Sequence, residues 1–104
     1  MKIATKSFGW TDPNAGAGVS NFYVYWAAGH TTPFAYELPK TAVPVVEGQT
    51  EYVFQLPGPI PLTEGEWTLW VAAADAEGNI SDPGMLTRFF DFTAPVAPVN
   101  LRVL

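Results

Sequence analysis

Four stretches of the chain alternate between large apolar side chains and smaller or polar ones with a period of two. They are SNFYVYWAA (20–28), EYVFQL (51–56), EWTLWVAAAD (66–75) and MLTRFFDF (85–92). A period of two sends successive side chains to opposite faces of a strand, and aromatic and β-branched residues favour strands. Turn-forming residues bound these stretches, so the pattern predicts four β-strands.

Two weaker segments complete the expected set. KIATKSFGW (2–10) is predicted as a strand, although Lys6 shares a face with Phe8 and Trp10. PFAYEL (33–38) is predicted as a short edge strand, where a flanking proline is tolerated, and the residues between 39 and 48 as an irregular crossing. Six or seven short strands at roughly ten-residue spacing predict an all-β fold, a two-sheet antiparallel sandwich.

The inward faces of these strands supply a sizeable expected core. Each large apolar side chain that is fully buried contributes about 1.5–3 kcal/mol before the entropy of ordering is subtracted. The expected core residues are Trp10, Phe22, Val24, Trp26, Phe54, Leu56, Trp67, Leu69 and Val71.

Composition narrows the classes of function. The 104 residues suit one domain, and the chain has no cysteine, so neither disulfides nor thiolate metal sites are expected. The net charge is −5 and the five basic residues are scattered, which argues against nucleic-acid binding. No apolar run approaches a membrane span, and MKIATKSFGW is not a signal peptide. We expect either a cytoplasmic chain or a piece of a longer exported protein.

A resemblance rests on the order of three features: a first strand that ends in Trp10, then TDPNAGAGVSNFYVYW, then LTEGEWTLWVAAADAEGNIS. Over residues 2–92 this order is similar to fibronectin type III and bacterial Ig-like sandwiches. The resemblance implies a fibronectin type III-like module over residues 1–92. The segment 93–104 then resembles an inter-domain linker and the first strand of a following module, while the module's own first strand is missing. Trp67 stands where these families place the tyrosine of the tyrosine corner.

The acidic stretch after the strand at 66–75 has two interpretations. Asp75, Glu77 and Asn79 could offer oxygen ligands to calcium, but three ligands are half of the six to eight that calcium takes. Asn and Gly are also the residues that a tight turn selects, so we expect a structural turn.

The remaining candidate residues give no catalytic pattern. His30 is expected in a solvated loop, and Glu64 and Glu66 flank a turn at the entry to a strand. No phosphate-binding loop, dinucleotide fingerprint or nucleophile elbow is present. We therefore expect a protein that is not an enzyme and that uses no cofactor or metal.

The aromatic surplus is the main functional indication. If Phe22, Val24 and Trp26 point inward, the outward side chains are Tyr23, Tyr25, Trp70 and, on the last strand, Phe90. These four would form an exposed aromatic face that binds a partner, or ordinary cross-strand pairs. The expected function is a non-catalytic module for protein interaction or for spacing neighbouring domains. The alternative is a carbohydrate-binding accessory module of a polysaccharide-degrading enzyme, whose aromatic rings would stack on sugars. No nucleic-acid or membrane partner is expected.

The tail VAPVNLRVL alternates like a strand, but Pro95 and Pro98 favour a semi-extended linker. The final strand is expected to end at the pole opposite to where a first strand would begin, so antiparallel pairing within one chain would be strained. Three outcomes remain: the tail is loose, it pairs in parallel with the opening strand, or it fills the empty position in a second copy. We expect it to add little to monomer stability.

Overall fold

The computed structural model describes residues 6–29, 32–91, 97–100 and 102–103. Within them, the strands predicted at 2–10, 20–28, 51–56, 66–75 and 85–92 are confirmed, with shifted ends. The six strands are β1 (Lys6–Thr11), β2 (Asn21–Ala28), β3 (Lys40–Pro44), β4 (Glu51–Leu56), β5 (Gly65–Ala74) and β6 (Gly84–Phe90). No helix of the described residues could cross a membrane.

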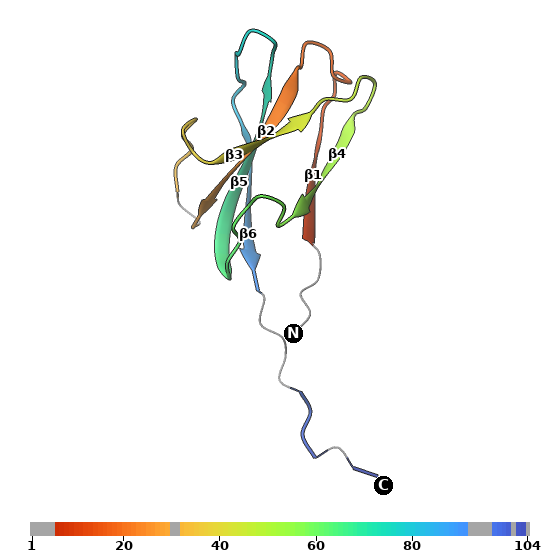
Figure 1. Ribbon diagram of the computed structural model, residues 1–104, viewed down its shortest axis with the longest axis vertical. Coiled ribbons are helices and arrows are strands. Elements are labelled where there is room, and N and C mark those ends of the chain that lie inside the picture. Colours follow the sequence, from red (N-terminus) through yellow and green to blue (C-terminus); the bar gives the residue numbers. More distant parts are fainter. Residues whose placement is uncertain (1–5, 30–31, 92–96, 101, 104) are drawn as a thin grey trace.

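The strands form two antiparallel sheets (Figure 1). β1 pairs with β4, and the other four strands follow the order β3-β2-β5-β6. In the larger sheet Tyr25 lies opposite Trp70, and Leu69 lies opposite Leu86. The protein is thus all-β, with an arrangement compatible with a β-sandwich.

The main core lies between the two sheets. Its buried members come from β2, β4, β5, β6 and the segment after β4, while Phe8, Trp10 and Phe54 of the small sheet are partly buried against it. Trp10 stacks on Tyr52, with 5.6 Å between the ring centroids and 6° between the planes. The fully clustered residues are Val24, Trp26, Leu56, Ile60, Trp67, Leu69 and Phe90. Residues predicted from the inward faces therefore do meet in one core.

The predicted edge strand at 33–38 is wrong, because β3 begins only at Lys40, inside the stretch expected to be irregular. Residues 33–38 instead cross the outer face of the large sheet, where Phe34 and Leu38 pack on Tyr25 and Trp70. A turn in which the Leu38 amide donates to the Ala35 carbonyl then leads the chain to the sheet edge. Residues 33–38 cannot both cover the rings of Tyr25 and Trp70 and pair with the edge of the sheet. They cover the rings, and β3 pairs with β2 instead.

Hydrogen bonds from two side chains fix the connections between strands. The Trp67 indole N–H donates to the carbonyl of Thr63, 3.0 Å away and four residues upstream. A tyrosine corner makes this kind of bond through a hydroxyl group, so the indole supplies the donor here. The Tyr52 hydroxyl accepts from the Val46 amide and donates to the Val46 carbonyl, which ties β4 to the crossing from β3.

Candidate functional site

The structure does not bring the four predicted aromatic residues together at the surface. Tyr25 and Trp70 are 0% and 2% exposed beneath Phe34, whose ring centroid lies 5.0 Å from that of Tyr25 and 5.5 Å from that of Trp70. Phe90 is 0% exposed and belongs to the core on the opposite face of the sheet. Tyr25, Trp70 and Phe90 therefore contribute no exposed aromatic face to a partner.

Tyr23, the fourth residue, is half-buried and remains at the rim of this outer cluster. The Lys40 ammonium group lies 5.3 Å from its ring centroid and 5.6 Å from that of Tyr25. The Tyr25 hydroxyl is buried without a hydrogen-bond partner among the described residues. Burial, followed by the nearby hydroxyls of Tyr23 and Tyr36, raises the pKa of this group. The cluster is thus a second small core and its tyrosine stays protonated.

The acidic stretch after β5 is the predicted structural turn. One Asp75 carboxylate oxygen accepts from the amides of Glu77 and Asn79 at 3.0 and 2.9 Å, and the other accepts from the Asn79 side-chain amide at 2.9 Å. Gly78 has a φ of 88°, a conformation that glycine adopts readily. The hydrogen bond from the Asn79 side chain, then those from the backbone, lowers the pKa of Asp75. The carboxylate oxygens are therefore committed to the turn.

The other candidate residues add no site. His30 lies outside the described residues, and Glu64 and Glu66 are exposed at the entry to β5. Within the described ranges, no group of three or more His, Cys, Asp or Glu side chains is placed to hold a metal ion.

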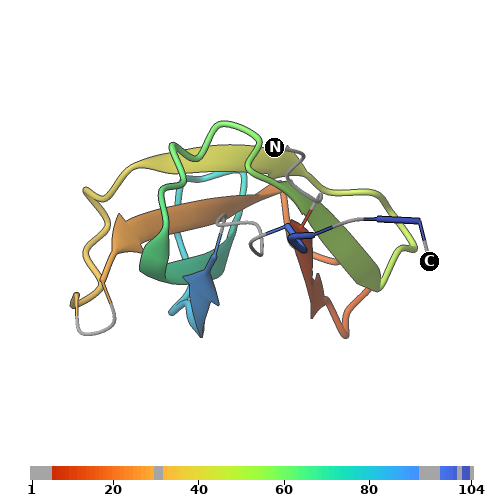
Figure 2. The same ribbon diagram turned by 90° about the horizontal axis from the view of Figure 1, so that it is seen from below.

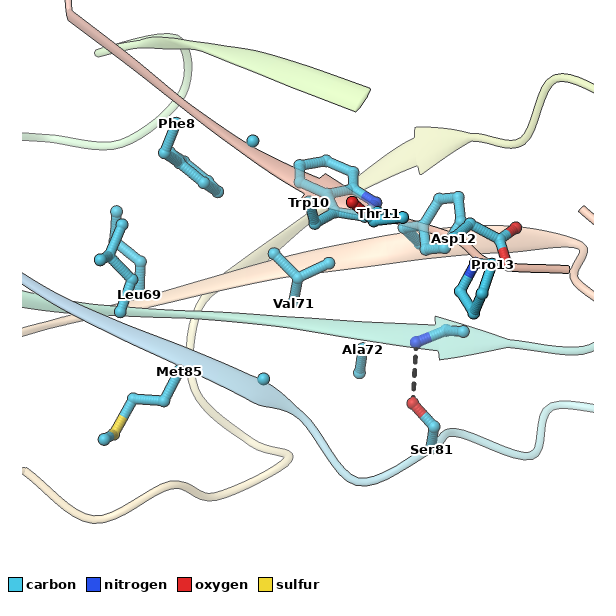
Figure 3. Close-up of a pocket in the computed structure, with 15 residues that line it drawn as sticks. Phe8, Trp10, Thr11, Asp12, Pro13, Leu69, Val71, Ala72, Ser81 and Met85 are labelled. Carbon is cyan, nitrogen blue, oxygen red and sulfur yellow. Dashed lines mark hydrogen bonds between the residues drawn. The ribbon is translucent and has the colours of Figure 1, made fainter. Parts of the chain in front are cut away.

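Among the described residues, the geometry offers an apolar groove between the edges of the two sheets, which we call the edge groove. It runs between β1 of the small sheet and β5 and β6 of the large one, and has a volume of about 480 Å³. Figure 3 shows Phe8 and Trp10 on one wall and Leu69 and Val71 on the other. The opposite side of the molecule is spanned by the chain that crosses from β3 to β4, so the sheets are open at β1 and β6 (Figure 2).

The groove has a hydrogen-bonding edge as well as apolar walls. The Asp12 amide donates to the Thr50 carbonyl at 2.7 Å, just beyond the β1–β4 ladder. Because bonding alternates along an antiparallel pair, Trp10, Phe8 and Lys6 bond to β4, and Ser7, Gly9 and Thr11 turn their amides and carbonyls away from it. Within the described residues, β1 has no strand on that side. Its outer edge is thus a row of backbone donors and acceptors.

One of these groups is covered by a side chain from the other sheet. Arg88 of β6 donates from Nη1 to the Ser7 carbonyl at 2.9 Å, and its guanidinium carbon lies 5.5 Å from the Phe90 ring centroid. This contact joins β6 to β1 at one end of the edge groove. For Gly9 and Thr11, no hydrogen bond from the outer side is found within the described part of the chain.

The β6 wall leaves apolar side chains in water. Leu86 points toward the core side of its sheet yet is 41% exposed, and Met85 is 69% exposed. Val71 and Trp10, which were predicted in the core, are only partly buried because they line the groove. Burying such surface is favourable at about 25 cal/mol per Å², so an apolar occupant would be stabilised here.

The edge groove was not among the predicted sites. The one signal for it in the sequence was the resemblance stated above, which implies a further strand ahead of residues 2–10 that the alternation of side chains does not show. The outward-facing aromatic residues Tyr25 and Trp70 lie instead on the covered face of the large sheet. Comparison with known proteins adds no relative: no family model, no curated protein and no solved structure matches the chain.

Proposed function

We propose that the protein is a non-catalytic β-sandwich module that binds an extended protein segment in the edge groove by β-strand addition. The observation that carries this proposal is the free backbone edge of β1 beside apolar walls. In strand addition, main-chain hydrogen bonds supply affinity and alternate side chains enter pockets. The strand order and the sequence features described above support a fibronectin type III-like or bacterial Ig-like module whose first strand position is filled from elsewhere.

Carbohydrate binding has less support. Stacking on sugar rings requires exposed aromatic faces, and three of the four residues on which that alternative depended are buried. Among the described residues, the large exposed rings are those of Tyr36 and Phe89, which come from separate segments. The edge groove therefore supports protein interaction better than carbohydrate binding.

Selection of peptides tests the proposed function. A displayed library of eight-residue peptides is panned against the full chain at low micromolar concentration, and a selected peptide is titrated into isotopically labelled protein. We expect selected sequences to alternate apolar and polar residues, and the amides of Gly9 and Thr11 to become protected from hydrogen exchange on binding.

Variants on the two faces of β6 provide the control. Leu86→Asp places a charge on the groove wall and should weaken peptide binding at least tenfold, whereas Phe89→Asp, on the outer face of β6, should leave it unchanged. Equal binding by the wild type and the Leu86→Asp variant would overturn the proposal. Tryptophan fluorescence changes on titration with soluble polysaccharides, without peptide binding, would favour the carbohydrate alternative.

A further inference from the structure

We propose that the occupant of the edge groove is the tail of a second copy of this chain, residues 97–104. The inference rests on the proposed function, since it names the segment that the groove accepts. The tail of one copy would then take the place of the missing strand beside β1 of the next copy.

The tail is available for this role because it does not pack on its own domain. Val99 and Val103 are 78% and 99% exposed, and none of the described tail residues is in a strand. The ten-residue β5 accounts for roughly 33 Å at about 3.3 Å per residue. The molecule measures 68 Å along its longest axis because the tail projects from one end (Figure 1). Two large apolar side chains are thus presented to solvent on an extended segment.

The tail and the groove match in length and pattern. Val99, Leu101 and Val103 alternate with Asn100, Arg102 and Leu104, so one face of an extended tail would be apolar throughout. The free edge of β1 runs from Ser7 to Thr11, five residues, and the alternating part of the tail spans the same number from Val99 to Val103. Its apolar face would lie against Phe8, Trp10 and Leu86, which the groove leaves incompletely covered.

The direction of the chain favours a second copy over the molecule's own groove. β6 ends with Phe90 at the end of the molecule where β1 begins, as the Arg88–Ser7 bond shows. An antiparallel partner of β1 must enter at the opposite end, beside Thr11. The tail of the same chain would have to travel back past the groove before entering it, whereas prolines at positions 95 and 98 favour an extended linker over such a reversal.

If a second copy lies beyond the tail, the tail already runs in the direction that antiparallel pairing with the β1 of that copy requires. β6 and the tail run away from the domain in the same sense (Figure 1). A copy stacked end to end receives the tail at its Thr11 end, antiparallel to its β1. Each copy then offers one tail and one groove, and such a heterologous contact continues from copy to copy as an open chain.

Sedimentation velocity on two complementary full-length variants tests this inference. Val99→Asp/Val103→Asp removes the apolar face of the tail and leaves the groove intact, and Leu86→Asp does the reverse. We expect the wild type to form dimers and longer chains as its concentration rises. Each variant alone should remain monomeric, and an equimolar mixture should form a heterodimer, because one partner retains a tail and the other a groove.

Matched controls separate this contact from nonspecific association. Asn100→Asp/Arg102→Gln changes the net charge by −2, as Val99→Asp/Val103→Asp does, but on the opposite face of the extended tail. This variant should associate like the wild type. Phe89→Asp should also associate. A heterodimer in the mixture, with protection of Gly9 and Thr11 amides in the partner that retains its groove, supports the inference.

Other outcomes overturn it. A wild type that is monomeric at all concentrations rules out the tail of a second copy. Protected Gly9 and Thr11 amides in that monomer, lost in the tail variant, would place the tail in its own groove. If a synthetic peptide of residues 97–104 does not bind the tail variant while library peptides do, this inference fails and the proposed function stands. If no peptide of either kind binds, both fail.

Discussion

Trp67 and Trp70 lie on opposite faces of β5, and both are buried, at 6% and 2% exposure. Removing a large aromatic side chain from a packed interior costs about 3–5 kcal/mol. We predict that Trp70→Ala and Trp67→Ala each lower the free energy of unfolding by about that amount in urea denaturation. Phe89→Ala, at 60% exposure, should cost less than about 1 kcal/mol. A Trp70→Ala loss as small as that of Phe89→Ala would mean that the outer cluster contributes little.

Asp75 makes the stability of the folded protein depend on pH in the acid range. Its pKa is lowered from the ordinary value of 3.8, because three hydrogen bonds favour the carboxylate. A lowered pKa means that the contribution is complete above pH 3.8 and is lost as pH falls through the folded-state pKa. We predict that Asp75→Asn is less stable than the wild type at neutral pH, and that the difference shrinks in strong acid.

Thermal melts from pH 7 down to about pH 2 measure this difference across the range in which carboxylates titrate. Glu77→Gln is the matched control, since its side chain accepts none of the bonds within the turn. A stability difference between Asp75→Asn and the wild type that is the same at both ends of the range would contradict the assignment.

At the residue scale, the sequence predicts which side chains face the core. It does not predict which outward-facing side chains are covered by another segment of the chain. The period of two correctly placed Val24, Trp26 and Leu69 on one face. It also correctly separated Tyr25 and Trp70 from them, but a periodicity carries no information about a loop that crosses the outer face. Phe34 is such a residue, and its covering contacts depend on a chain path that no local pattern specifies.

Among the elements, Tyr52 links β4 to the crossing from β3. Its hydroxyl makes hydrogen bonds of 3.1 and 3.2 Å with the Val46 amide and carbonyl. We predict that Tyr52→Phe lowers the free energy of unfolding by about 1–3 kcal/mol, because two backbone groups lose their partner. Tyr36→Phe is the control: its hydroxyl is 3.4 Å from the Ser81 carbonyl on a side chain that is 43% exposed. Equal losses in chemical denaturation for the two variants would refute this role.

The strands themselves were largely predictable, and the reason is local. Five alternate clearly enough, or end in clear enough turns, to be located from the sequence. The exception is β3, where KTAVP has a proline at its end and the competing segment PFAYEL has the stronger strand composition. Which of the two pairs with β2 is decided by tertiary packing over the outer face, so local preference gave the wrong answer.

At the scale of the whole molecule, we expect the tail to add little to the stability of one copy. Val99 and Val103 are mostly exposed, and the described tail residues make no strand. We predict that deleting residues 96–104 leaves the denaturation midpoint unchanged at concentrations where the chain is monomeric. At higher concentration the intact chain should become more stable than the deletion variant, because association stabilises the folded state by mass action. A loss of several kcal/mol in the dilute monomer would mean that the tail completes its own domain.

The two-sheet architecture followed from strand number and spacing, but the edge groove did not. Alternation of apolar and polar side chains shows where strands lie along the sequence. It does not show which strand edge is left without a neighbour in the sheet. The position of β1 beside β6, and the contact of Arg88 with Ser7, arise from how the two sheets face each other. These relations between distant segments could not be read from the residues in either one.

The contact between Arg88 and Ser7 bears on the order in which a proposed partner strand would pair with β1. A strand that approaches from the Ser7 end meets a carbonyl that already has a donor, whereas Thr11 and Gly9 present groups that water alone can satisfy. If a strand adds to β1 as proposed, we expect pairing to begin at the Thr11 end and to displace the guanidinium group last. The same bond shields the edge while it is vacant, since a charged side chain across an open edge discourages unwanted pairing. Under the proposed function, Arg88 would therefore oppose the last step of strand addition at the Ser7 end.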